Sequence, residues 1–433
     1  MPITEQLETG NPDKASEMLE QARRANKYAE KDRFLYFVDA GMLNHYARHY
    51  DSSNVKLHLA DAASEELFTK SISRAAASLV LNDNILEYAG EDYEILYANL
   101  VSSLNYVALN QFDDAFVEIR RANDKLNVLE SKYADAAAEL QKGNPDDSNR
   151  VQIDYEVPHV RFYNDAFGRY LSMHMYAADG KMDDARIDYD YLVDAFESQP
   201  NIYDFPMPDV TYASDEGPVL SVVALVGLSP LKQALNLRIR TDKDLDLVQV
   251  LYDGPGKEDV EYGHFPMPVD VDYYFKFAIP VIVARPSMVE SIRVIVDGET
   301  IGQLHLIEDV TKVAEETFRA KKALIYIRSV ARAIAKGLAT HRMKEKADTG
   351  GFAGWLKKAA IDVGSDVSEN ADLRSCQFLP GRVFVGDFSI APGTHNLTVQ
   401  FLDANSGLVK QLDYTDYVVL KNGLNLIQAY SVD

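Results

Sequence analysis

The segment YVALNQFDDAFVEIRRA, residues 106–122, decides how the first half of the chain is expected to fold. A first helix is predicted to close at Tyr106, after which Asn110 and Gln111 turn the chain. A second helix opens at Phe112, with small and large apolar residues at helical spacing. The residues expected to pack between the two helices are Tyr106, Phe112, Ala115, Ile119 and Ala122. The segment therefore predicts a tight helical hairpin.

The same pattern recurs within residues 1–200. A second copy is YAADGKMDDARIDYDYL, residues 176–192, and a weaker copy runs from Gly41 to Ala60. The positions of the second copy that match are Tyr176, Gly180, Met182, Ala185, Tyr189 and Leu192. An aromatic residue, a tight turn and then small and large residues are typical of tetratricopeptide (TPR) repeats. We therefore expect a TPR-like array of helical hairpins over residues 1–200.

The chain opens on half of such a repeat. The residues that fit its second helix are Gly10, Ala15, Leu19 and Ala22. One repeat cannot bury its apolar face alone, so we expect the natural chain to extend upstream of Met1; the alternative is a helical cap. Extra helical sequence at 65–90 interrupts the spacing of the repeats. This irregularity favours a compact array wrapped around another part of the protein, such as its C-terminal half.

The second half of the chain has the sequence pattern of β-strands. A continuously apolar run at 218–226 predicts a buried strand, and alternating strands are expected at 235–240 and 247–252. Three stretches predict hairpins from their turn residues: 292–306 around Asp297-Gly298, 384–402 around Pro392-Gly393, and 417–430 around Asn422-Gly423. Short strands at this rhythm indicate β-rich, sandwich-like modules at 214–308 and 371–433. The predicted fold class is α+β, and whether the strands form one module or two stays open.

One long amphipathic helix is expected between these modules, at 309–347. Its apolar stripe consists of Ala320, Leu324, Ile327, Ala331, Ile334 and Leu338. Basic residues fall on another face, among them Arg328, Arg332 and Lys336. We expect these three to face acidic residues of the helical repeats and to tie the halves together. The alternative is that Arg342, Lys344 and Lys346, beyond the stripe, meet an anionic partner or lipid headgroups.

Composition excludes several functional classes. The 433 residues carry a formal net charge of -23, which argues against general binding of nucleic acids, because phosphates attract basic surfaces. The lone cysteine, Cys376, allows no internal disulfide. No apolar run reaches the length of a membrane span.

Four stretches resemble a family of uncharacterised bacterial TPR envelope lipoproteins. They are YAGEDYEILYANLVSSLNYVALNQFDDAFVEIRRANDKL (88–126), VGLSPLK (226–232), RSVARAIAKGLA (328–339) and ADLRSCQFLPGRV (371–383). The chain departs from the family at Cys376, where a tryptophan is expected. The resemblance implies helical repeats with a β-rich C-terminal portion, on the periplasmic side of the outer membrane. It also implies a signal sequence and a lipid anchor, both trimmed from this sequence, and it brings no catalytic residues.

Candidate chemical sites are sparse. His45 and His49 lie one helical turn apart, but no third metal ligand accompanies them, so an ordinary helix face is the better interpretation. The acidic loops 241–247 and 403–407 lack the twelve-residue calcium pattern. Cys376 has no identifiable activating base. The sequence therefore predicts no metal, no cofactor and no catalytic set.

These observations favour a non-catalytic envelope scaffold that binds a protein or peptide partner through TPR-like helices. The alternative is a regulator that binds glycan or peptidoglycan through the β-rich half, with Trp355 and tyrosines stacking on sugars. Candidate partner-binding or interdomain residues are Arg328, Arg332, Lys336, Trp355 and Arg374. The identity of the partner and the oligomeric state are not determined by the sequence.

Overall fold

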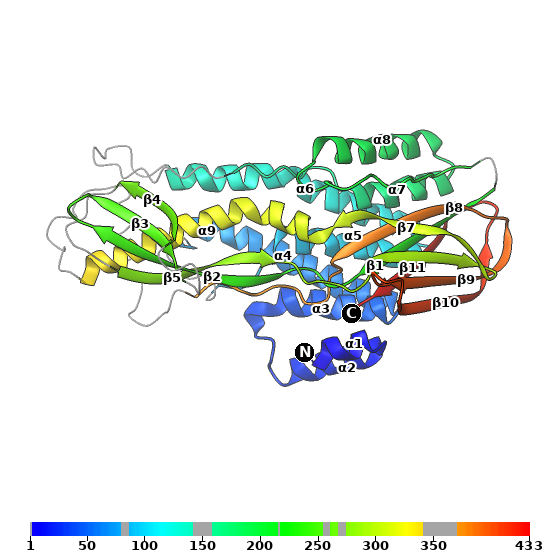
Figure 1. Ribbon diagram of the computed structural model, residues 1–433, viewed down its shortest axis with the longest axis horizontal. Coiled ribbons are helices and arrows are strands. Elements are labelled where there is room, and N and C mark those ends of the chain that lie inside the picture. The colour runs from blue at the N-terminus through cyan, green and yellow to red at the C-terminus, as the bar shows by residue number, and fades with distance from the viewer. Residues whose placement is uncertain are drawn as a thin grey trace.

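The computed structural model confirms a mixed α+β fold, with helices in the first half and a β-rich second half (Figure 1). It describes residues 2–78, 86–141, 158–214, 217–253, 260–266, 274–340 and 370–433. The helices of the first half are α1 (Pro2–Glu8), α2 (Pro12–Arg24), α3 (Arg33–Tyr46), α4 (Tyr50–Ser78), α5 (Asp92–Ala108), α6 (Phe112–Gln141), α7 (Ala166–Ala178) and α8 (Met182–Ser198). A short 3-10 turn, η1 (Glu30–Asp32), precedes α3.

The helices pair as hairpins with one recurring turn. Gly10, Arg48, Asn110 and Gly180 occupy it, each with a positive φ between 56° and 78°. In every case the amide of this residue donates to the carbonyl three residues back, and the next amide donates to the carbonyl five residues back. These two bonds satisfy carbonyls that the end of the first helix would leave unpaired. Glycine and asparagine tolerate the left-handed conformation most readily, and Arg48 is the exception.

The strands form two sheets. The strands are β1 (Val219–Val226), β2 (Leu231–Asp242), β3 (Leu247–Tyr252), β4 (Glu261–Pro266), β5 (Tyr274–Val283), β6 (Ser291–Val296), β7 (Glu299–Asp309), β8 (Arg382–Ser389), β9 (Gly393–Leu402), β10 (Leu408–Val419) and β11 (Asn425–Ser431). The larger sheet has the order β10-β9-β6-β7-β8-β1-β11, and the smaller one has the order β4-β3-β2-β5. The larger sheet takes strands from both 214–308 and 371–433, so these two ranges share one sheet.

The larger sheet nearly closes on itself. Its edge strands are β10 and β11, and the Tyr414 hydroxyl of β10 donates to the Gln428 carbonyl of β11 at 2.6 Å. At the interior of the sheet, β1 pairs with β8 in the antiparallel direction and with β11 in the parallel direction. Strand β1 is buried along almost its whole length, as its apolar sequence predicts, because its alternate residues pack into two cores, Val223 and Leu225 against the helices and Val222 and Ala224 inside the sheet.

Two of the three predicted β-hairpins are wrong. The hairpin at 292–306 is confirmed, because β6 and β7 pair across Asp297-Gly298. At 384–402, however, β8 pairs with β1 and β7, whereas β9 pairs with β6 and β10. At 417–430, β10 and β11 lie at opposite ends of the strand order. Alternating residues identify a strand but not its partner, and here burial against distant apolar strands overrides the local turn signals.

The long helix α9 (Val310–Thr340) directly follows β7 and packs against β5 and α5. Of the predicted apolar stripe, Ala320 and Leu324 are at most 2% exposed, whereas Ile327 is half-buried. Although α4, α6 and α9 are long, the described part of the chain contains no helix apolar enough to cross a membrane. The helix instead links the smaller sheet to the helical half.

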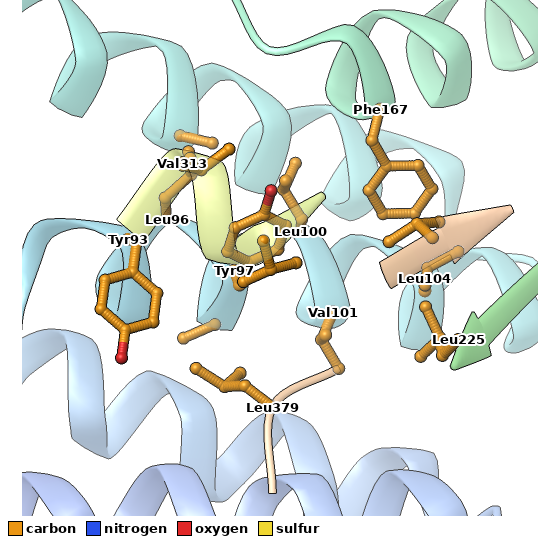
Figure 2. Close-up of a cluster of buried hydrophobic side chains, with 14 of the residues drawn as sticks. Tyr93, Leu96, Tyr97, Leu100, Val101, Leu104, Phe167, Leu225, Val313 and Leu379 are labelled. Carbon is orange, nitrogen blue, oxygen red and sulfur yellow. The ribbon is translucent and has the colours of Figure 1, made fainter. Parts of the chain in front are cut away.

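The main core lies around α5 (Figure 2). Leu100 and Leu104 of this helix lie among Phe167 of α7 and Leu225 of β1, and Val313 of α9 lies nearby. We call α3, α5 and α7 the inner helices, because they pack on the β-rich half, and α4, α6 and α8 the outer helices. The inner helices are buried on several sides, which is consistent with the expected array wrapped around the C-terminal half.

Candidate functional site at the start of α5

The first turn of α5 is capped by two glutamates. The Glu91 side chain accepts from a backbone amide at the third position of the helix, and the Glu94 side chain accepts from the Glu91 amide at 2.8 Å. This reciprocal capping box satisfies amides that the helix start leaves free. The sequence signal of this capping box is a pair of glutamates three residues apart (ExxE) just before an apolar helix. Both glutamates are almost fully buried, so they need further partners.

Glu91 obtains its partners from the second half of the chain. Lys232 of β2 donates to one carboxylate oxygen at 2.7 Å, and Lys321 of α9 donates to the other at 2.6 Å. Burial raises the pKa of the Glu91 carboxyl, but the two ammonium groups outweigh it and lower the pKa to about 2. The Glu91 carboxylate is therefore a charged junction between α5, the smaller sheet and α9.

Glu94 has the opposite electrostatic environment. The Tyr88 hydroxyl donates to it at 2.8 Å and the Cys376 amide donates at 2.6 Å. Burial and the adjacent Glu91 charge raise its pKa. Burial and Glu94 also raise the pKa of the Cys376 thiol well above its usual value, so the thiol is unsuited to act as a nucleophile at neutral pH.

Arg374, a residue singled out in the sequence, lies beside this junction. Its guanidinium forms ion pairs with Asp372 at 2.7 Å and Asp32 at 2.8 Å, and donates to the Leu86 carbonyl at 3.0 Å. It also lies 5.0 Å from the centre of the Tyr88 ring. Burial opposes its charge, but the two aspartates raise its pKa. Arg374 thus fastens the segment before β8 to the helical half.

A buried serine, histidine and aspartate meet between α7 and the larger sheet. The Nε2 atom of His174 lies 3.1 Å from the Asp387 carboxylate, and the Ser221 hydroxyl lies 3.2 and 3.4 Å from the two ring nitrogens. The Ser221 hydroxyl is almost equally far from the two ring nitrogens, so it does not lie on the hydrogen-bond axis of either one. Asp387 also accepts from the Tyr170 hydroxyl and the Thr211 amide. All three side chains are buried, so we interpret the group as a structural link between α7 and the sheet.

The other predicted interface residues are only partly visible. Arg328, Arg332 and Lys336 belong to α9, but the structure does not describe their side chains. Trp355 and the segment with Arg342, Lys344 and Lys346 also lie outside the described residues. An ion pair between α9 and an acid of the helical half is observed at Lys321, a residue that the prediction did not single out. The contacts expected of Arg328, Arg332 and Lys336 stay a prediction.

The two histidines considered as metal ligands have different surroundings. His45 is buried and hydrogen-bonds Asn105 at 2.6 Å, and burial lowers its pKa to about 4. His49 is exposed and lies 3.5 Å from Asp13. Among the described residues, no group of three or more His, Cys, Asp or Glu side chains is arranged to hold a metal ion.

The predicted TPR packing residues lie in two helical hairpins. Ala115, Ala122 and Ala185 are at most 2% exposed, and they face the partner helix as small residues at close contacts do. Tyr106, Phe112 and Tyr176 are half-buried, and Gly180 occupies the recurring turn. These positions fit helical hairpins, and the TPR assignment itself stays a prediction.

Sequence reasoning missed the residues at the centre of the junction, Glu91, Lys232 and Lys321. The ExxE spacing was available as a signal for the capping glutamates. Nothing in the sequence around Lys232, which lies in an alternating strand, marks a lysine that is buried.

Comparison with known proteins does not assign the chain to a family. No protein-family model, no curated protein and no solved structure matches it. The function therefore has to be inferred from the geometry of the described residues and from the sequence pattern.

Proposed function

We propose that the protein is a non-catalytic scaffold of the bacterial cell envelope, with TPR-like hairpins that bind a protein partner on their outer side. The hairpin turn that recurs four times and the resemblance at 88–126 support the TPR-like interpretation. The observation that carries the proposal is the burial of the inner helices. The β-rich half already covers α3, α5 and α7, so the surface available to a partner belongs to the outer helices.

The chemically distinctive groups support a structural role. Glu91, Glu94 and Arg374 are buried or half-buried, and each is engaged by groups from distant parts of the chain. Reactive groups of enzymes are usually left open to substrate in a cleft. The charges at the junction instead hold the two halves in one arrangement.

The outer helix α8 offers the best partner surface. Ile187 and Tyr191, which lie one turn apart on the same face of the helix, are each more than 40% exposed, although side chains of this size are normally buried. Three aspartates of this helix are exposed, Asp183, Asp184 and Asp190, and Asp194 is half-buried. An apolar surface rimmed by acids is complementary to a basic amphipathic segment, so we propose such a segment on the partner.

A photo-crosslinking experiment tests this partner surface. A photoreactive amino acid at Ile187 should capture one protein in envelope fractions, and the purified partner should bind the wild-type chain in solution. Ile187→Glu with Tyr191→Glu should weaken that binding at least about tenfold, because charge replaces buried apolar contacts. Leu245→Glu, which alters a residue 69% exposed in the turn between β2 and β3, is the matched control. Equal loss in the control, or a partner captured only from the β-rich half, would refute the α8 surface.

The cellular location is tested separately. The full native gene should yield a protein that fractionates with the outer membrane and incorporates labelled fatty acid. A chain recovered wholly in the cytoplasm would overturn the envelope part of the proposal and leave the α8 surface untouched.

A further inference from the structure

We propose that Arg48 and Lys410 form a binding site for a small oxyanion, a carboxylate or phosphate group, where the α3–α4 turn meets β10 and β11. A tyrosine ring lies beside each cation, and Arg48 is exposed whereas the Lys410 ammonium is buried. The inference does not depend on the scaffold proposal, since it concerns a small ligand at the seam of the larger sheet.

Lys410 of β10 is a cation without an acceptor. Its Nζ atom is buried and, within the described part of the chain, has no hydrogen-bond partner. It lies 3.7 Å from the centre of the Tyr430 ring on β11. A buried ammonium usually pairs with a carboxylate or with carbonyls, as Lys232 does with Glu91. Burial, with a smaller contribution from Arg48, lowers the Lys410 pKa to about 8.

Arg48 is a second cation at the same place, on an unfavourable backbone. Among the four helical-hairpin turns described above, its turn is the one occupied by neither glycine nor asparagine, and its φ is 61°. An arginine costs free energy in this left-handed conformation, and such strain is often retained where a side chain has a functional role. Its guanidinium is 5.3 Å from the Tyr414 ring centre, and no ion pair to a carboxylate is found for it among the described residues.

Tyrosines from both halves form the walls. Tyr50 of α4, Tyr414 of β10 and Tyr430 of β11 are half-buried, so their rings line the seam and remain reachable from solvent. The Tyr414 hydroxyl is fixed by its bond to the Gln428 carbonyl. Tyr46 of α3 packs against Tyr430 at a tilt of 43°, with ring centres 4.8 Å apart. Aromatic faces stabilise cations and restrict the space to a compact ligand.

The charges around the proposed site favour an anion as its ligand. The carboxylate close enough to affect Tyr430 is that of Asp13, and it already lies 3.5 Å from the His49 ring. Among the described residues, neither Arg48 nor Lys410 forms an ion pair with a carboxylate, although the protein has a net charge of -23. An oxyanion would give Lys410 its missing acceptor and would bind the fork of the Arg48 guanidinium.

Calorimetry and thermal unfolding test the site. Inorganic phosphate and acetate are titrated in parallel at constant ionic strength, with chloride as the reference, so that the two arms identify which oxyanion is preferred. We expect one or both to bind the wild-type protein and to raise its Tm, and Lys410→Met and Arg48→Gly to weaken binding by about tenfold or more. Lys421→Met, an exposed lysine, is the control that should leave binding unchanged.

The Arg48→Gly variant separates binding from stability. Glycine adopts the turn without strain, so we expect its ligand-free Tm to rise by about 1–2 °C while its response to the oxyanion is lost. Wild-type binding should weaken as pH rises past about 8, because Lys410 loses its charge. The other charged residues around the site are Arg48, Asp13 and His49. Unchanged affinity in both variants, or no difference from chloride in the wild type, would overturn the proposal.

Discussion

At the residue scale, one helical turn holds two carboxyl groups with opposite behaviour. Glu91 meets two lysines and is fully ionised, whereas Glu94 meets neutral donors and resists ionisation. The ExxE spacing makes the capping box predictable from sequence. The partners were not predictable, because Lys232 and Lys321 are 141 and 230 residues away from Glu91 along the chain. A buried lysine in a strand differs from an exposed one only through the tertiary structure.

We predict that Glu91→Gln destabilises the protein by about 3–5 kcal/mol, because it removes the charged carboxylate to which the buried Lys232 ammonium donates. Urea unfolding at pH 7 measures the effect. The Glu91 pKa lies below that of the unfolded chain, so its contribution is complete above about pH 4.5 and disappears as pH falls toward 2. Glu17→Gln is the control, because the Lys14–Glu17 pair is more than half exposed and should change stability by less than about 0.5 kcal/mol. Similar effects of both variants would contradict a structural role for the junction.

A second buried acidic cluster predicts a pH effect of the opposite sign. Asp165 caps α7 through one oxygen, while its other oxygen and one oxygen of Glu308 have no hydrogen-bond partner in the described structure. Tyr203 donates to Glu308, and the Tyr97 hydroxyl is likewise unpartnered. Burial raises the pKa of Asp165 to about 6 and that of Glu308 well above its usual value. Ionising this cluster is therefore unfavourable in the folded protein.

We predict that Asp165→Asn stabilises the protein at pH 8 by about 1–3 kcal/mol and changes little at pH 4. The raised pKa means that the folded chain binds more protons than the unfolded chain between about pH 4 and 6, so wild-type stability falls across that window. Asparagine cannot ionise, and its carbonyl oxygen keeps the bond from the Gly168 amide. Unfolding free energies measured from pH 4 to 8 test this. If the variant were less stable than wild type at pH 8, the Asp165 carboxylate would have to be stabilised by interactions other than the hydrogen bonds described, and the prediction would be wrong.

At the element scale, helices and strands differ in how much of them the sequence predicts. A helical hairpin is local: the turn at Asn110 and the small residues Ala115 and Ala122 lie within 17 residues of Tyr106 and indicate both helices and their contact. The hairpins predicted at 384–402 and 417–430 located β8, β9 and β11 but missed most of β10, and both predicted pairings were wrong. Asn422-Gly423 is a strong hairpin signal, yet β11 pairs with β1, about 200 residues earlier in the chain. Burial of β1 between β8 and β11 removes more apolar surface from water than a two-stranded hairpin would.

At the scale of the whole molecule, neither half is complete without the other. The inner helices bury apolar side chains against β1 and α9, and β1 is covered by α5 and α7 in turn (Figure 2). The Glu91 junction, the Arg374 ion pairs and the Tyr170–Asp387 bond all cross between the halves. The sequence predicted a helical array wrapped around another part of the chain, but which residues make the contact depends on the assembled fold.

We therefore predict one cooperative unfolding transition for the full chain and no stable native state for residues 1–200 alone. In the isolated fragment, Leu100, Leu104 and the other apolar residues of α5 that face β1 would be exposed to water, while local helix formation would persist. The fragment should keep helical far-ultraviolet circular dichroism, lose near-ultraviolet tyrosine signals and bind a hydrophobic dye. Far- and near-ultraviolet transitions of the full chain should coincide. A fragment that unfolds sharply at the Tm of the full chain would show that the hairpins are an autonomous array, and that contact with the β-rich half is not what stabilises them.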